Sequence, residues 1–224
     1  MLNKSKGNMY PWVTHTWNPI RGKCPHDCSY CYMKRYPQPE LHFDDKEIKT
    51  YLGSENFIFV GSSCDMWARD IPDAWIKSVL EQCIKYPQNK YLFQSKNPAR
   101  FKDWLFPPNF ILGTTIETNR TYSNEVYHAP YRKERMEAMS AIQQPIQKII
   151  SIEPIINFDS DILLDWVQTI NPMFVSVGAD SGNNHLPEPS WEKVQSLINR
   201  LKQITEVRIK DNLRRLNQAV MEAE

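Results

Sequence analysis

Short apolar runs recur along the chain, and each is followed by a polar turn and then by a longer segment in which apolar residues have helical spacing. These longer segments predict helices at residues 72–86, 131–142, 160–170 and 190–204, with a polar helical tail at the end. The apolar runs predict β-strands at residues 12–17, 56–61, 90–95, 109–117, 147–154, 173–180 and 206–210. Strands and helices therefore alternate along the predicted chain.

This alternation predicts an α/β fold, because parallel strands need helix-length connections between them. The strand candidates are continuous apolar runs, which is typical of a sheet that is covered on both faces. We expect an open doubly wound sheet or a partial or full parallel (β/α) barrel of about six to seven strands. In either fold, the chemistry is expected at the C-terminal ends of the strands.

The length of 224 residues, 41% of them hydrophobic, suits one sizeable core and is short for two. No internal repeat, low-complexity linker or block of charge separates two domains in the sequence. The sequence therefore predicts a single domain over residues 1–224, with an N-terminal extension at 1–11 and a C-terminal helical tail at 212–224.

The charges nearly balance, with 27 Lys and Arg against 26 Asp and Glu and a net charge of +1, so no overall field attracts the protein to nucleic acid or membranes. No apolar run approaches the roughly 20 residues of a membrane span, and no apolar stretch near the N-terminus is typical of a signal peptide. We expect a cytoplasmic protein. In that reducing compartment, five cysteines with three clustered indicate metal or redox chemistry rather than disulfides.

Polar residues follow every predicted strand at its C-terminal end. One such residue is ordinary in a loop, but seven strands in succession that deliver polar groups to the same edge indicate a functional site. The first strand is followed by the clustered cysteines, and the later ones by Ser62, Ser63, Cys64 and Asp65; Ser95, Lys96 and Asn97; Thr115, Glu117 and Asn119; Glu153; Gly178, Asp180 and Ser181; and Lys210.

The clustered cysteines are Cys24, Cys28 and Cys31, in the spacing C-x3-C-x2-C. Thiolates are soft ligands that suit zinc and iron–sulfur clusters. A structural zinc site needs four protein ligands, and His26 or Cys64 would have to supply the fourth. A [4Fe-4S] cluster usually binds four cysteines, so three would leave one iron open for a substrate or cosubstrate. The spacing alone leaves both metal sites as hypotheses.

The stretch CPHDCSYC also matches the C-x3-C-x-φ-C motif of the radical S-adenosylmethionine (SAM) enzymes, with Tyr30 as the aromatic residue φ. Further blocks, TWNPIRGKC, SKNPARF, LGTTIETN, SIEP, FVSVGADSG and VRIKDN, resemble in order those of a phage-associated family of three-cysteine radical SAM proteins of unknown function, the DUF5131 type. The resemblance extends from about Thr16 to Asn212. Two features depart from that family: Ala179 and Asp180 replace its Gly and Glu, and the cysteine loop is shorter.

The resemblance implies a radical SAM barrel in which Cys24, Cys28 and Cys31 bind three irons of a [4Fe-4S] cluster and the fourth iron binds SAM. It also implies an external one-electron donor of the flavodoxin or ferredoxin type, a 5′-deoxyadenosyl radical that abstracts hydrogen from a substrate, and sensitivity to oxygen. The residues that would contact SAM are Tyr30, Gly61, Ser62, Ser63, Asp65, Thr115, Glu117, Asn119 and Gly178.

Four charged residues remain as candidate catalytic groups, for the substrate or for SAM: Lys96, Glu153, Asp180 and Lys210. The alternative is that the two lysines pair with the two acids as a purely structural network, because buried charges need partners.

We therefore expect a radical SAM enzyme that acts on an unidentified substrate. A nucleobase in DNA or RNA, modified or repaired, is the first candidate, because the phage association and the absence of a recognisable cap domain favour a large substrate that closes the barrel itself. A peptide or a small metabolite is the second. The alternative function is a zinc-stabilised module that binds nucleic acid or protein without SAM chemistry.

Overall fold

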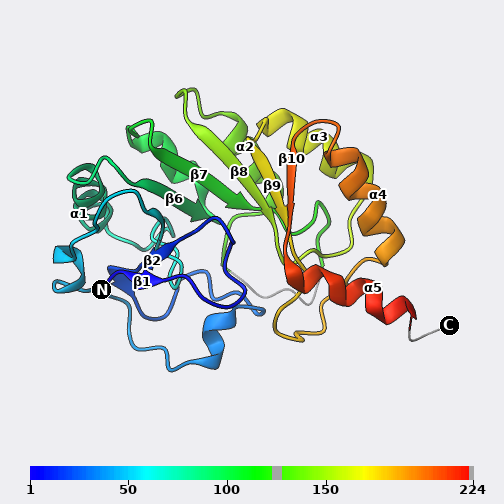
Figure 1. The fold of residues 1–224 in the computed structure, drawn as a ribbon, viewed down its shortest axis with the longest axis horizontal. Coiled ribbons are helices and arrows are strands. Elements are labelled where there is room, and N and C mark those ends of the chain that lie inside the picture. The colour runs from blue at the N-terminus through cyan, green and yellow to red at the C-terminus, as the bar shows by residue number, and fades with distance from the viewer. Residues whose placement is uncertain (123–127, 222–224) are drawn as a thin grey trace.

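The computed structural model describes residues 1–122 and 128–221 and is built on an eight-stranded sheet (Figure 1). The strands are β1 (Asn3–Lys4), β2 (His15–Trp17), β5 (Phe57–Val60), β6 (Lys90–Ser95), β7 (Phe110–Thr115), β8 (Gln147–Ile152), β9 (Phe174–Val177) and β10 (Glu206–Ile209), in this spatial order. All neighbours pair in parallel except β1 and β2. The α/β fold with a parallel sheet is confirmed, and the sheet is open, as in a partial barrel.

Helices connect most of the parallel strands, as the apolar spacing predicts. They are α1 (Asp73–Ile84), α2 (Arg132–Ser140), α3 (Ser160–Ile170) and α4 (Trp191–Leu201), and α5 (Arg214–Met221) follows β10. The connection from β6 to β7 contains only the 3-10 helix η3 (Pro98–Asp103). Residues 222–224 of the expected C-terminal tail lie outside the described residues. No helix among the described residues is both long and apolar enough to cross a membrane.

The longest connection, from β2 to β5, carries the cysteines. It contains the 3-10 helix η1 (Tyr32–Arg35), a two-stranded antiparallel hairpin of β3 (Ile20–Arg21) and β4 (His42–Phe43), and the 3-10 helix η2 (Glu47–Lys49). A last 3-10 helix, η4 (Asp211–Leu213), leads into α5. The cysteine motif therefore lies in a loop that leaves the C-terminal end of a parallel strand, as the sequence predicts.

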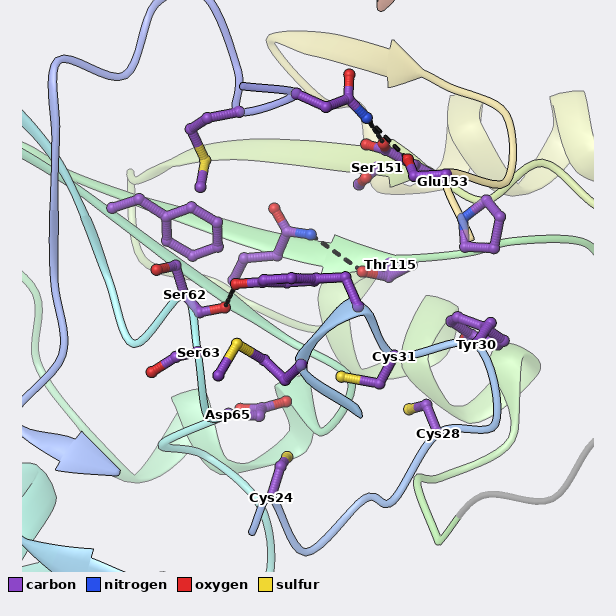
Figure 2. Close-up of a pocket in the computed structure, with 18 of the residues that line it drawn as sticks. Cys24, Cys28, Tyr30, Cys31, Ser62, Ser63, Asp65, Thr115, Ser151 and Glu153 are labelled. Atoms are coloured by element: carbon purple, nitrogen blue, oxygen red, sulfur yellow. Dashed lines mark hydrogen bonds between the residues drawn. The ribbon is translucent and has the colours of Figure 1, made fainter. Parts of the chain in front are cut away.

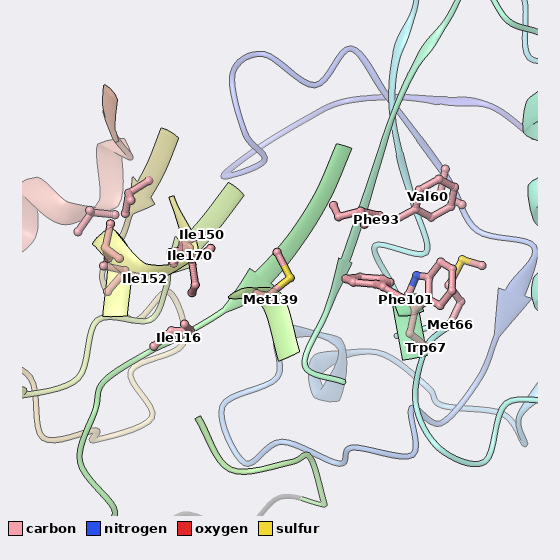
Figure 3. Packing of buried hydrophobic residues seen from close by; sticks show 14 of the residues in the cluster. Val60, Met66, Trp67, Phe93, Phe101, Ile116, Met139, Ile150, Ile152 and Ile170 are labelled. Atoms are coloured by element: carbon pink, nitrogen blue, oxygen red, sulfur yellow. The ribbon is translucent and has the colours of Figure 1, made fainter. Parts of the chain in front are cut away.

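The larger core lies between the helices and the outer face of the sheet, where buried side chains from strands and helices pack together (Figure 3). On β6, Tyr91 and Phe93 belong to this core, while Leu92 between them belongs to a second, smaller one. Side chains alternate between the two faces of a strand, so the two cores mark the outer and inner faces of the sheet. Helix α3 contributes to the outer core with residues spaced three or four apart, Leu163, Val167 and Ile170.

The inner core is covered by the N-terminal segment rather than by a helix. Tyr10 and Val13 belong to a cluster with residues of five strands, among them Phe59, Ile149 and Phe174. Trp12 stacks on Tyr10 with ring centroids 4.6 Å apart and meets the edge of Phe174 at 4.8 Å. Residues 1–11, expected as an extension, thus supply an edge strand and part of the core.

The inner face changes from apolar to polar along the strands. On β6, Leu92 is followed two residues later by Gln94, and on β8, Ile149 is followed by Ser151 and then, just past the strand, by Glu153. Residues two apart share a face, so this order puts apolar side chains under the N-terminal segment and polar ones at the C-terminal edge. The polar end is where a cavity opens.

We expect Trp12→Ala to lower the free energy of unfolding by about 2–3 kcal/mol, because Trp12 joins the N-terminal segment to the inner face. The side chain of Arg208 also lies over the Trp12 ring, 4.5 Å from its centroid. Urea unfolding followed by circular dichroism measures the change. Trp12→Phe, which keeps an aromatic ring, should lose clearly less. An unchanged midpoint for Trp12→Ala would show that the segment does not stabilise the sheet.

Candidate active site

A cavity of about 500 Å³ opens at the C-terminal ends of the parallel strands (Figure 2). Its size falls within the range of about 300–1,000 Å³ that is usual for ligand pockets. The predicted site residues that line it are Cys24, Cys28, Tyr30, Cys31, Gly61, Ser62, Ser63, Asp65, Lys96, Thr115, Glu153, Asp180 and Lys210. Glu117, Asn119 and Gly178 lie outside the lining. In Figure 2 the cysteines lie at the bottom of the view and Ser151 and Glu153 at the top.

The three clustered cysteines are free thiols on one side of the cavity. Cys28 is buried, while Cys24 and Cys31 are partly exposed. A hydrogen bond from the Cys64 thiol lowers the pKa of Cys24 to about 6, against burial, so Cys24 has marked thiolate character. Burial raises the pKa of Cys28. Within residues 1–122 and 128–221, no three His, Cys, Asp or Glu side chains are arranged to hold a single metal ion.

The pair of buried His26 and largely covered Asp65 attaches the cysteine loop to the sheet. Nε2 of His26 lies 2.9 Å from Oδ2 of Asp65, which also accepts hydrogen bonds from the Ser95 hydroxyl at 2.9 Å and the Lys96 backbone at 2.8 Å. Burial disfavours the charged form of both partners, but their attraction raises the pKa of His26 and lowers that of Asp65. Asp65, which follows β5, therefore connects the end of β6 with the cysteine loop.

A second anchor holds Tyr30, the aromatic residue of the motif, on the carboxylate of Glu117. The Tyr30 hydroxyl donates to Oε1 of Glu117. Glu117 is completely buried just past the end of β7, where Arg132 and Arg135 of α2 reach it at 3.1 and 3.0 Å. Nζ of Lys96 lies 3.8 Å from Oε1 of Glu117. Burial opposes ionisation, but these cations, Arg135 most strongly, lower the pKa of Glu117 well below its usual value.

Lys210 and Glu153 form an ion pair at the opposite side of the cavity, with Nζ 2.9 Å from Oε1. Lys210 also donates to the backbone carbonyl of Asn8, whose side-chain amide donates to Glu153 at 3.3 Å. Burial raises the pKa of Glu153, and Lys210 opposes this shift. Both lysines thus pair with acids, as expected for a structural network. Lys210 pairs with Glu153, whereas Lys96 lies near Glu117 instead of Glu153 or Asp180.

The remaining predicted residues shape the walls. The side chain of Asp180 accepts hydrogen bonds from the backbone of Gly182 at 2.9 Å and of Asn184 at 2.5 Å, so it orders its own loop. Asn119 exchanges hydrogen bonds with Asp159, outside the cavity. A Cβ at Gly178 would lie 2.9 Å from Cδ of Glu153, so glycine there leaves room for the Glu153 side chain.

Sequence reasoning missed a buried hydrogen-bond network at the base of the cavity. The Tyr10 hydroxyl lies 3.0 Å from Oε1 of Gln94 and 2.9 Å from the Ser151 hydroxyl, and Gln94 donates to Thr115 at 3.0 Å. Gln94 and Ser151 have a sequence signal, because they are the polar inward positions of otherwise apolar strands. Tyr10 has none, since it reaches the cavity from an N-terminal segment with no regular pattern.

Solved structures of spore photoproduct lyase have the same fold. A cysteine-to-serine mutant superposes with a TM-score of 0.61 at 13% identity, over 89% of this chain and 64% of that one. A tyrosine-to-phenylalanine mutant gives 0.65 at 10%, over 91% and 78%. A double mutant with bound AdoMet and dinucleoside spore photoproduct gives 0.60 at 12%, over 88% and 64%. The chain thus spans somewhat under two thirds of the first of these lyases, and it shares their fold.

The family of the chain follows from its sequence. Residues 8–203 match the family described as protein of unknown function (DUF5131), and the chain belongs to that family. No curated protein matches it.

We expect Glu117→Gln to lower the free energy of unfolding at pH 7 by about 3–5 kcal/mol, because it leaves buried cations around a neutral amide. The folded-state pKa of Glu117 is depressed, so its contribution is complete above its usual pKa of 4.5 and is lost as the pH falls toward the folded value. The difference between variant and wild type, measured by urea unfolding, should be constant from about pH 6 to 8 and narrow below about pH 4.5.

The matched control is Asp159→Asn, because Asp159 also meets an arginine, Arg120, but 42% of its side chain is exposed. Solvent screens that pair, so the control should keep the wild-type midpoint. Equal effects of the two substitutions would contradict the anchoring role of Glu117.

Proposed function

We propose that the protein is a radical SAM enzyme in which Cys24, Cys28 and Cys31 bind a [4Fe-4S] cluster and the cavity beside them binds SAM. The observation that carries this proposal is the meeting of three free thiols, in the C-x3-C-x2-C spacing, at the wall of a cavity of about 500 Å³ in a radical SAM-like fold. Support for SAM comes from the similar lyase that is described with bound AdoMet.

The donor set fits the cluster. Three thiols line the cavity, and His26, one of the two groups that could supply the fourth ligand of a zinc site, is already paired with Asp65. A cluster held by three cysteines leaves one iron for SAM. When bound, it would supply the electron that cleaves SAM reductively to methionine and a 5′-deoxyadenosyl radical.

The chain's own residues would stabilise the negative charge of this site. The Cys64 thiol favours the thiolate of Cys24. Lys96 is partly buried beside the cysteine loop. Burial disfavours its charge, but the attraction of Cys28 and Glu117 raises its pKa, so it stays protonated. Its Nζ lies 5.1 Å from the centroid of the Tyr30 ring. Lys96 thus supplies a fixed positive charge next to thiolate ligands.

The walls suggest how SAM would be held. We propose that the polar groups of SAM are bound by cavity-lining residues at the ends of two strands. These are Gly61, Ser62 and Ser63 after β5, and the hydroxyl of Thr115 at the end of β7. Asp65, Glu117, Asn119 and Gly178 would act indirectly by positioning these walls, because their contacts are with other protein groups. Glu153, Asp180 and Lys210, together with Lys96, face the cavity and are the candidates for contact with substrate or SAM.

The substrate that we propose is a nucleobase in DNA or RNA, which the enzyme would modify or repair by hydrogen abstraction. The similar lyases support this choice, because they are described in complex with a dinucleoside photoproduct. Electrons would come from a separate one-electron donor of the flavodoxin or ferredoxin type.

We expect Cys28→Ala, purified and reconstituted without oxygen, to lose most of its bound iron and all 5′-deoxyadenosine formation with SAM and dithionite. Iron and sulfide assays and chromatography of the nucleoside products measure this. The matched control is Cys83→Ala, because Cys83 is buried in α1 away from the cavity. It should keep both properties. Stoichiometric zinc, with no iron and no 5′-deoxyadenosine in the wild type, would instead support a zinc-stabilised binding module.

A further inference from the structure

The residues that line the cavity divide into an interior and an exposed rim of different chemistry. We define the rim as the lining residues whose side chains are exposed: Lys6, Gly7, Asn8, Tyr32, Arg35, Tyr36 and Ser181. It contains two cations and two tyrosines. No carboxylate belongs to the rim.

The carboxylates of the lining lie below the rim, and each has partners there. Asp65 pairs with His26, Glu153 pairs with Lys210, and Asp180 accepts hydrogen bonds from its own loop. A ligand that approaches the mouth from solvent therefore meets Lys6 and Arg35 before the acids of the lining. The rim is complementary to a ligand that carries negative charge.

The tyrosines of the rim belong to the segment just after the last cysteine. Tyr32 is 47% exposed and Tyr36 is 59% exposed, although large aromatic side chains usually lie inside a protein. The Tyr32 hydroxyl donates to the carbonyl of Ser62 at 2.8 Å, so its ring is fixed across the mouth. Proteins that bind unstacked bases without sequence preference stack them on exposed aromatic rings next to cations.

The rim is also braced. Arg35 donates to the carbonyl of Ser181 at 2.7 Å, and the Asn8 amide donates to the hydroxyl of Ser181 at 2.8 Å. Helix η1, the N-terminal segment and the loop after β9 are thus joined around the opening. Among the described residues, Arg35 uses one of its five N–H donors in this way, and Lys6 forms no ion pair.

We propose that the rim is a docking surface for single-stranded nucleic acid, with bases stacked on Tyr32 and Tyr36 and phosphates bound by Lys6 and Arg35. This inference rests on the proposed function and narrows its substrate class. The base must be single-stranded or extruded, because Cys28 and the network around Tyr10 lie buried below the rim and a base stacked in a duplex cannot reach them. Arginine binds phosphate through two parallel N–H groups, which suits the partly engaged Arg35.

The test is fluorescence anisotropy with labelled DNA and RNA single strands of about 12 nucleotides and the matching duplexes. The wild type should prefer single strands and lose affinity as salt rises from about 50 to 200 mM. Tyr36→Ala and Arg35→Gln should each weaken binding about tenfold, whereas Tyr36→Phe keeps it. Arg35→Gln and Lys6→Gln should each also reduce the salt slope by about one. The DNA and RNA arms identify which strand is the ligand.

The controls are Tyr51→Ala, because Tyr51 is 74% exposed outside the lining, and Lys202→Gln, because exposed Lys202 follows the C-terminal end of α4 away from the lining. Both should bind like the wild type. Four results would each overturn the proposal. Two concern the wild type, which would bind no strand at low salt or would bind duplex more strongly than single strands. The other two are binding that is unchanged in the rim variants and binding that polyglutamate competes equally.

Formation of 5′-deoxyadenosine without nucleic acid separates this inference from the proposed function. If the product forms but strands do not bind at the rim, the docking surface is wrong and the radical SAM assignment stands. If strands bind through the rim but no product forms, the docking surface stands and the radical SAM assignment is wrong.

Discussion

The carboxylate of Glu117 is the point on which the site depends. It lies fully buried just past β7 and joins Tyr30 of the cysteine loop, Lys96 at the end of β6 and the arginines of α2. A buried charge is costly unless partners surround it, so these elements are held together as a set. Because Tyr30 lies between two of the cysteines, the same contacts fix where the thiols face the cavity. His26 and Asp65 provide the second point of attachment.

The inside of the open sheet is filled in two different ways along its length. At the N-terminal ends of the strands, Tyr10 and Val13 pack on apolar side chains, and the inner face needs no closing strand. At the C-terminal ends, the same inward positions carry Gln94 and Ser151, which hydrogen-bond to Tyr10. One N-terminal segment therefore covers the apolar part and forms the base of the cavity.

Much of this architecture was predictable, because it depends on local patterns. Seven apolar runs with helix-length connections specify a parallel sheet, and the C-terminal ends of its strands bring Cys24, Lys96 and Lys210 to one cavity. What could not be predicted depends on pairing between distant segments. Nothing near Glu117 in the sequence indicates that α2 would surround it with arginines and turn it away from the cavity.

The short strand β1 illustrates the same limit, since two residues carry no periodicity and become a strand only by pairing with β2.

The near-zero net charge is an average over groups with different environments. A balance of 27 basic and 26 acidic residues predicts no overall attraction to a polyanion. At the cavity, however, the acids of the lining are mostly covered and have partners, while Lys6 and Arg35 remain exposed among the lining residues. Screening limits the reach of charges to about 8–10 Å, so a ligand at the mouth responds to these nearest groups rather than to the total. Acids that are mostly covered and paired, beside exposed cations, can thus give a nearly neutral chain a locally cationic entrance.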